Sequence, residues 1–215
     1  MTKADTDMAQ ILSVHPENPQ KRALAQAVEA LQRGEIIVYP TDACYALGWG
    51  MQALRAAEEV RALRGLSSRQ PFALNCADLA QVGGFATINN RAHRLMRELT
   101  PGPYTFLLSA TREVPRKLLD PKRRIIGVRI AASPTVQALL EGLGEPFMTS
   151  TLQLEDEALP ISELDDLPKR LTDRVAVVLD AGAGGFEPST VIDCSGDTPE
   201  LVRAGKGPVE DYLLD

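Results

Sequence analysis

The stretch that decides the fold is EIIVYPTDACYALG, residues 35–48. Residues 36–39 are β-favouring and follow one another without a polar break, which is typical of a strand covered on both faces. Pro40 removes a backbone donor and ends the strand. Thr41 and Asp42 follow at its carboxyl end, where open α/β sheets usually bind ligands. An ordinary turn, with Asp42 bonded to its own backbone, explains the same residues equally well, so the rest of the chain has to decide.

The composition is that of a soluble globular protein with one domain. The chain has 215 residues, of which 44% are hydrophobic and 24% charged, and its net charge is −6. A chain of this length can bury a sizeable core. No apolar run approaches the roughly 18 residues that a membrane span requires, and residues 1–10 lack the apolar core of a signal peptide. We therefore expect a cytoplasmic protein with no membrane partner.

Periodicity predicts an α/β fold. Helical patterns cover residues 19–33, 53–64, 89–99, 133–143 and 208–213, and strand patterns cover residues 36–39, 72–76, 104–108, 125–130, 147–151, 175–179, 189–193 and 201–203. Several strands follow one another without a helix, so we expect a single mixed sheet of about seven strands with helices on both faces. Residues 1–14 are predicted to be a flexible N-terminal tail, and residues 15–215 to form the domain.

Hydroxyl and guanidinium groups recur at the ends of the predicted strands. They are Thr41, Arg129, Thr149, Ser150, Thr151, Ser189, Thr190 and Arg203. Planar guanidinium groups bind phosphate or carboxylate through paired hydrogen bonds, and hydroxyls add single bonds. Each charge-assisted bond contributes roughly 1.5–3 kcal/mol, so a few that converge would bind an oxyanion with micromolar affinity.

Other kinds of site fit the sequence poorly. There is no GxxxxGK[ST] and no GxSxG, and the glycine-rich run 181–185 lacks the GxGxxG spacing and a following helix. The cysteines and histidines show neither CxxC nor metal-ligand spacing, so no metal site is predicted. Cys44 close to Asp42 could be a nucleophile, although a small buried cysteine is the commoner case. The basic residues between 112 and 124 indicate either a local anionic ligand or a solvated charged face.

Several motifs together resemble the YrdC/YciO family, which includes the threonylcarbamoyl-AMP synthases. They are YPTD at 39–42, YALG at 45–48, PGPYT at 101–105, GVRI at 127–130, TST at 149–151, STVID at 189–193 and RAG at 203–205. The resemblance covers residues 15–210 and is closest to the YciO branch, in part through CYALG at 44–48.

The resemblance implies a twisted mixed sheet with a concave, positively charged cavity. It implies that ATP, bicarbonate and L-threonine or a related amino acid are converted to threonylcarbamoyl-AMP, or its counterpart for the related amino acid, and pyrophosphate. This adenylate is the precursor for threonylcarbamoyladenosine in tRNA, and Mg²⁺ would be brought by the nucleotide. The residues that would bind substrate and nucleotide are Thr41, Asp42, Arg64, Gln70, Arg129, Thr149, Thr151, Ser189 and Arg203. Members of the family are also associated with RNA, and the residues that would bind it are Arg116, Lys117, Arg123 and Arg124.

This chain departs from the synthase pattern at several positions. Synthases usually carry Lys-x-Arg-Pro where this chain has Arg64-Gly65-Leu66-Ser67, so Leu66 replaces a guanidinium. Loss of one phosphate contact would cost about 2 kcal/mol, or about 30-fold. Ala43 replaces a threonine, and Asn75 replaces a common histidine. Two hypotheses follow: a threonylcarbamoyl-AMP synthase, possibly weak or altered in substrate, or a non-catalytic protein that binds double-stranded RNA or tRNA.

Overall fold

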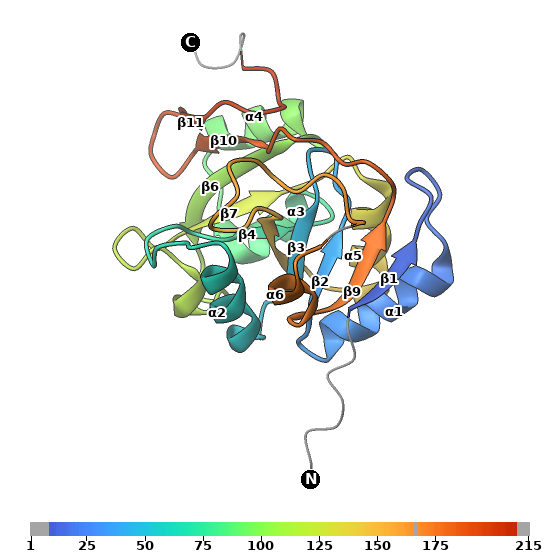
Figure 1. The fold of residues 1–215 in the computed structure, drawn as a ribbon. Helices are drawn as coiled ribbons and strands as arrows, with labels where there is room; N and C mark the ends of the chain where they lie inside the picture. The colour runs from blue at the N-terminus through green and yellow to red at the C-terminus, as the bar shows by residue number, and fades with distance from the viewer. Residues whose placement is uncertain (1–8, 166, 210–215) are drawn as a thin grey trace.

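A computed structural model describes residues 9–165 and 167–209. The elements in chain order are β1 (Gln10–Ser13), α1 (Lys21–Gln32), β2 (Ile36–Tyr39), β3 (Ala46–Gly50), α2 (Leu54–Leu63), β4 (Ala73–Asn75), α3 (Leu79–Phe85), β5 (Ala86–Thr87), α4 (Asn90–Leu99), β6 (Tyr104–Ala110), the 3₁₀ turn η1 (Arg116–Leu118), β7 (Ile125–Arg129), α5 (Pro134–Leu143), β8 (Phe147–Thr151), α6 (Lys169–Thr172), β9 (Val175–Asp180), β10 (Thr190–Asp193) and β11 (Glu200–Arg203). Figure 1 shows them in one layered body.

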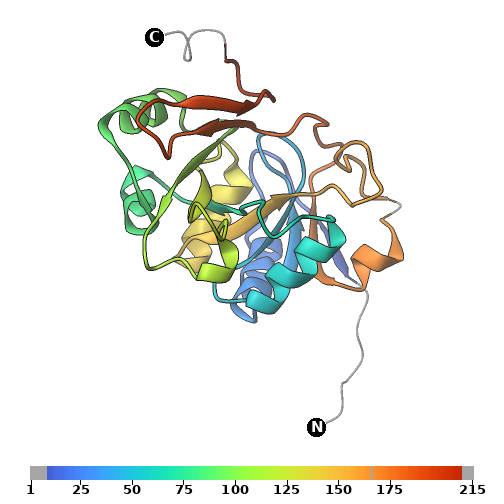
Figure 2. The same cartoon turned by 90° about the vertical axis from the view of Figure 1, so that its left-hand side faces the viewer.

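All the strands belong to one mixed sheet, as predicted. Its order is β1-β9-β2-β3-β8-β4-β7-β6-β10-β11, with β5 paired to β6. Figure 1 shows the sheet running from β1 beside α1 to β10 and β11 at the opposite end. Figure 2 shows β10 and β11, in red, lying together across the top of the molecule. The sheet contains parallel pairs such as β2 with β9 and antiparallel pairs such as β3 with β8, so the mixed α/β class is confirmed.

The predicted number of about seven strands was too low, because the sheet has 11 strands. The missed strands are β1, β3 and β5. Strand β3 has the sequence ALGWG, in which alanine and glycine are poor strand formers. It is nevertheless a central strand, paired on one side with β2 and on the other with β8. Its neighbours, rather than its own side chains, make it a strand.

The predicted N-terminal tail also needs a correction. Residues 10–13 form β1, which pairs in parallel with β9, and Val14 N donates to Asp180 O at 2.7 Å. The strand lies at the edge of the sheet and its burial is low, so its sequence has the polar character of a tail. Residues 1–8 and most of the predicted helix at 208–213 lie outside the described residues. Within the described part of the chain, no helix has the length and apolar character needed to cross a membrane.

Helices cover both faces of the sheet, as the alternation in β2 requires. Ile37 and Tyr39 pack with α1 and α5 in one core, whereas Ile36 and Val38 pack with α2 in the other. Local signals place the helices well. Ser133 caps α5 by accepting from Val136 N, and Gly144 ends it in the left-handed conformation at φ 75°.

Candidate functional site

The loop after β2 is tied to the end of β7 by a buried ion pair. Arg129 Nη2 donates to Asp42 Oδ1 at 2.7 Å, and each side chain is 8% exposed. The second carboxylate oxygen accepts from Ala132 N at 2.8 Å. The Nε–H of Arg129 is buried and has no partner among the described residues. Asp42 therefore does not form the local turn that its sequence allowed; it holds a guanidinium 87 residues away in the chain.

Thr41 is the residue that makes the local turn. Its hydroxyl donates to Cys44 O at 2.6 Å and accepts from Ala43 N at 3.1 Å. These bonds close the chain between β2 and β3 and leave Cys44 only 4% exposed. The opening stretch does contain a turn, but Thr41 makes it, and Asp42 belongs to the long-range ion pair.

Two further arginines approach the same loop. Arg64, directly after α2, donates from Nη1 to Ser150 Oγ at 2.6 Å and from Nε to Gln153 O at 3.1 Å. Arg203, at the end of β11, donates from Nη2 to Ser189 O at 2.7 Å. Neither forms an ion pair with a carboxylate in the described ranges 9–165 and 167–209.

The arginines influence one another and the thiol of Cys44. Burial, with a contribution from Arg203, lowers the pKa of Arg64 to about 10. Burial also lowers the pKa of Arg203, and Arg129 lowers it further. Burial raises the pKa of Cys44, although Arg129, Arg203 and Arg64 each act in the opposite direction. The three guanidinium groups therefore lie close enough to Cys44 to share one electrostatic environment, and the raised pKa makes this thiol a poor nucleophile.

One face of the sheet changes from apolar to polar near Cys44. On this face α1 and α5 cover Ile37 and Phe147. Further along the sheet the same face carries Thr149, Asn75 and Arg129, as the strand register requires. Polar side chains follow where the apolar helix cover ends, and Arg129 is one of them.

The buried polar side chains on this face form a hydrogen-bonded network that the sequence did not reveal. Tyr39 Oη lies 2.5 Å from Thr149 Oγ1, and Asn75 Nδ2 donates to Tyr39 Oη at 2.7 Å. Burial raises the pKa of Tyr39 to about 12, so it stays a neutral donor. Asn75 Oδ1 has no partner among the described residues. A tyrosine inside a strand of aliphatic residues is the signal that could have found this network, because a buried hydroxyl needs a partner.

The remaining predicted hydroxyl residues lie at the same place. Ser189 Oγ lies 2.8 Å from Thr105 Oγ1, and both residues are buried. Thr151 lies beside Cys44, whose thiol it reaches with a side-chain hydrogen bond. Thr105, within the PGPYT motif, was quoted for the resemblance but was missing from the predicted site.

Gln70 forms its hydrogen bonds outside this cluster. Its Oε1 accepts from Ser67 N at 2.9 Å, and its carbonyl accepts from Arg61 Nη1 at 3.2 Å. It is exposed and organises the loop that follows α2. Its predicted role toward a substrate stays a prediction.

The predicted RNA-binding residues lie in and after η1, and two of them have carboxylate partners. Lys117 Nζ lies 3.5 Å from Glu58 Oε1, and Arg123 Nη2 donates to Asp193 Oδ2 at 2.6 Å. Arg116 and Arg124 form no ion pair within the described part of the chain. The net basic character of this segment is therefore smaller than its sequence suggested.

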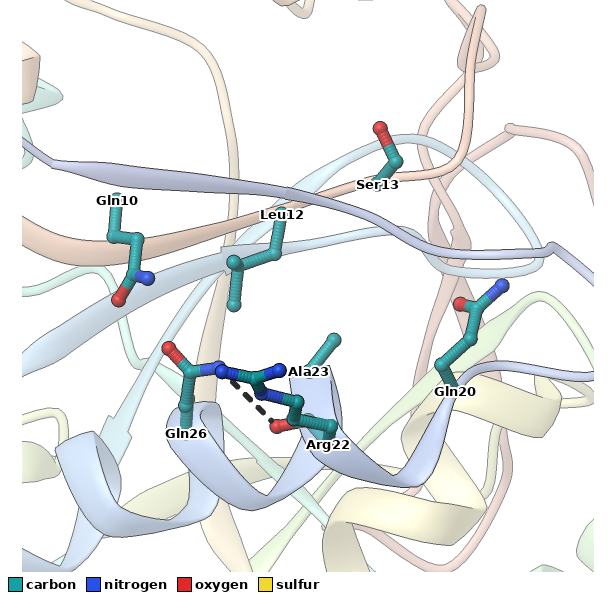
Figure 3. Close-up of a pocket in the computed structure, with 7 residues that line it drawn as sticks. All are labelled: Gln10, Leu12, Ser13, Gln20, Arg22, Ala23 and Gln26. Atoms are coloured by element: carbon teal, nitrogen blue, oxygen red, sulfur yellow. Dashed lines mark hydrogen bonds between the residues drawn. The ribbon is translucent and has the colours of Figure 1, made fainter.

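A hollow of about 330 Å³ lies elsewhere, between β1 and α1. Figure 3 shows that Leu12 and Ala23 face each other across it and that Gln26 lies beside Arg22. None of the predicted site residues lines it. The positively charged cavity at the arginines stays a prediction. No group of three or more potential metal ligands occurs among the residues that the structure describes.

This arrangement is suited to binding an anion. Three guanidinium groups and several hydroxyls converge from β7, β8, β11, the end of α2 and the loop after β2. Guanidinium groups offer several donors to phosphate or carboxylate oxygens. The lowered pKa of Arg64 means that its charge is disfavoured in the folded protein, and a bound anion would relieve that cost.

The family model Sua5_yciO_yrdC, described as telomere recombination, matches residues 29–205. The chain belongs to the Sua5/YciO/YrdC family. It is 43% identical to the uncharacterised protein YciO of Escherichia coli K12 over 206 residues, which cover 96% of this chain and all of that protein. The crystal structure of E. coli YciO superposes with a TM-score of 0.91 at the same coverage. The predicted family and its YciO-like character are confirmed.

More distant members of the Sua5/YciO/YrdC family carry a named activity. The threonylcarbamoyl-AMP synthase of Bacillus subtilis is 26% identical over 184 residues, which cover 85% of this chain and 53% of that protein. The crystal structure of Pyrococcus abyssi Sua5 with L-threonine has a TM-score of 0.81 at 22% identity and covers 91% of this chain and 57% of that one. At that identity the match with Sua5 shows a common fold.

Proposed function

We propose that the protein acts in the cytoplasm as a nucleotidyltransferase that joins the AMP part of ATP to the carbamate of an amino acid, L-threonine or a related one. The observation that carries the proposal is the convergence of Arg64, Arg129 and Arg203 on Cys44. Two of these arginines have no carboxylate partner within the described residues. The triphosphate and the carbamate are anions, and such a cluster suits both.

The chemistry needs positioning and charge stabilisation but no covalent enzyme intermediate. Bicarbonate and the amino group would form a carbamate with loss of water, and a carbamate oxygen would attack the α-phosphorus of ATP. The new P–O bond forms as the bond to the β-phosphate oxygen breaks, and pyrophosphate leaves. Arg64 and Arg203 would stabilise the charge on the phosphates, and the hydroxyls of Thr151 and Ser189 would hold the reactants in line. Mg²⁺ would enter with the nucleotide, and the product would serve threonylcarbamoyladenosine formation in tRNA.

The test is release of pyrophosphate from ATP in the presence of bicarbonate and a panel of amino acids. We expect release that depends on both bicarbonate and the amino acid, with an adenylate as the second product detected by mass spectrometry. The control is an Arg203→Met variant, which should lower the rate at least about tenfold because it loses one charge-assisted contact. If well-folded protein released no pyrophosphate with any amino acid, the proposal would be wrong.

The second candidate is binding of double-stranded RNA or tRNA without catalysis. Arg116 and Arg124, which form no ion pair in the described ranges, are the observation that favours it. Replacing Arg116 and Arg124 together by Gln should weaken RNA binding and reduce its salt dependence, since log K falls by about 0.7–0.9 per phosphate contact for each tenfold rise in salt. Replacing Lys117 and Arg123 together should have the smaller effect, since carboxylates already hold them. Equal affinity in all three proteins would exclude this segment as the RNA surface.

A further inference from the structure

The glycine-rich loop between β9 and β10 is held in place at several points. The hydroxyl of Tyr45 donates to Gly182 O at 2.6 Å and accepts from Ala181 N at 2.9 Å. Gly184 N donates to Ser162 O at 2.7 Å. The composition of this run predicts flexibility, but the hydrogen bonds fix its first half against the loop that carries Cys44.

The second half of the loop is pinned beside the predicted site. A Cβ atom at Gly185 would collide with the carbonyl oxygen of Ala43, the residue between Asp42 and Cys44. At the other end Pro188 O accepts from Lys206 N at 2.9 Å, and Ser189 O accepts from Arg203. The chain between residues 185 and 188 therefore spans from the Cys44 loop to Arg203.

Phe186 is the aromatic residue in this span. It is 58% exposed and lies next to the contact between Gly185 and Ala43. The large apolar side chains that are exposed in the described residues are Ile11, Leu159, Phe186, Leu201 and Val202, and Phe186 is the aromatic one among them. A single exposed apolar residue is ordinary. The backbone that carries this ring contacts the Cys44 loop at Gly185 and accepts from Arg203 at Ser189, so it is positioned before any ligand binds.

We propose that Phe186 is the stacking surface for the nucleobase of a nucleotide whose phosphates bind at Arg64 and Arg203. The inference rests on the proposed function, because it assumes that the anion at the arginines is a nucleoside triphosphate. The phosphates would take the charged centre of the site, and the base would extend to its rim. Aromatic side chains bind bases through their faces with little dependence on base identity, so GTP should bind with an affinity similar to that of ATP at this residue.

The test compares ATP with inorganic tripolyphosphate, which carries the same phosphates without the base. Titration calorimetry would measure both on the wild-type protein, Phe186→Ala and Phe186→Trp. Phe186→Ala should weaken ATP binding roughly 10- to 100-fold and leave the tripolyphosphate affinity within about twofold. Phe186→Trp should restore ATP binding, and its indole fluorescence should change with ATP but not with tripolyphosphate. Trp49 is the single tryptophan of the chain and is buried, so it contributes a constant background.

Ile11→Ala is the matched control, because Ile11 is 52% exposed and lies in the edge strand β1. It should leave both affinities unchanged. Equal ATP affinity of the wild-type protein and Phe186→Ala would overturn this inference alone. The same holds if Phe186→Ala lowered the affinities for ATP and tripolyphosphate equally. It also holds if, in a parallel titration with an RNA oligonucleotide, the variant lost affinity for the RNA only. A wild-type protein that binds neither ligand overturns the proposed function as well. ATP binding that depends on Phe186 without pyrophosphate release supports the inference and overturns only the proposed reaction.

Discussion

The site contains arginines in two different environments, one with a carboxylate partner and one without. In the locked pair, the carboxylate of Asp42 accepts from the guanidinium of Arg129 and from the backbone N–H of Ala132 inside the protein. In the open pair, Arg64 and Arg203, the guanidinium groups bond only to hydroxyl and carbonyl oxygens in the described chain. The locked pair is 8% exposed on both sides, whereas Arg203 is exposed.

The difference separates a structural role from a binding role. A charge that is buried with its partner lost its solvation during folding, and removing one partner leaves a charge that nothing balances. A charge that has no carboxylate partner retains the capacity to bind an anion. Arg129 thus fixes the loop after β2 in place, and Arg64 and Arg203 are the two of the three arginines whose guanidinium groups no carboxylate in the described residues neutralises.

Removal of Asp42 should have the largest effect on stability. Asp42→Ala leaves Arg129 buried and unpaired, so we expect the free energy of unfolding to fall by about 3–5 kcal/mol. For a chain of this size the melting temperature should fall by roughly 6–20 °C. Urea unfolding followed by circular dichroism measures the change.

The Asp42→Ala, Arg129→Met double variant tests whether the loss of stability in Asp42→Ala comes from the unpaired charge of Arg129. It should recover most of the lost stability, because an apolar side chain tolerates burial without a partner. The exposed pair formed by Lys169 and Asp173 is the control, since Asp173→Ala should cost less than about 1 kcal/mol. If the double variant lost as much free energy of unfolding as the two single variants together, Asp42 and Arg129 would not be a locked pair.

The open pair should give a smaller effect, and on binding instead of stability. Arg64→Met should weaken binding of ATP or tripolyphosphate roughly 10- to 100-fold, since one charge-assisted contact contributes roughly 1.5–3 kcal/mol. Its free energy of unfolding should change by no more than about 1 kcal/mol, because two hydrogen bonds are lost while a disfavoured charge is removed. Calorimetry and thermal unfolding of the same samples provide both values.

Arg55→Met is a matched control on the same helix. Arg55 lies in α2, its side chain is 88% exposed, and its salt bridge is with Glu59. It should change neither binding nor stability appreciably. If Arg55→Met and Arg64→Met weakened binding equally, the effect would be one of net charge and not of the open pair.

The sequence predicted the family, the fold class and most of the strand ends at which the proposed site residues lie, because strand patterns and motifs can be found along the chain itself. It did not predict which arginine would be locked. Asp42 lies beside Thr41 in the chain, and the sequence allowed it a local bond as readily as one to Arg129. From the sequence alone, Arg129→Ala would be expected to leave thermal stability nearly unchanged; the buried ion pair now predicts the opposite.

The strands that the sequence missed were missed for a related reason. Strand β3 is rich in alanine and glycine, and β1 is polar at both ends. Their strand character comes from hydrogen bonds to β2, β8 and β9, which are tertiary properties that a local pattern does not contain. The Tyr39 and Asn75 network was missed likewise, because its partners come from three separate strands.

Leu66 offers a way to add a cation to the open pair. It is half-buried and packs against the core that contains α2, at a position where the resembling synthases usually carry arginine. The stem of an arginine can retain part of that apolar contact while its guanidinium reaches a polar surface. Leu66→Arg should therefore raise ATP affinity or the rate of pyrophosphate release by about 3- to 30-fold, at most about 2 kcal/mol. A Leu66→Lys variant, which adds the charge without the planar fork, should give a smaller gain. If both variants lowered stability without raising the affinity or the rate, a third cation would add nothing to binding at Arg64 and Arg203. The departure at Leu66 would then indicate a ligand that carries less negative charge than ATP.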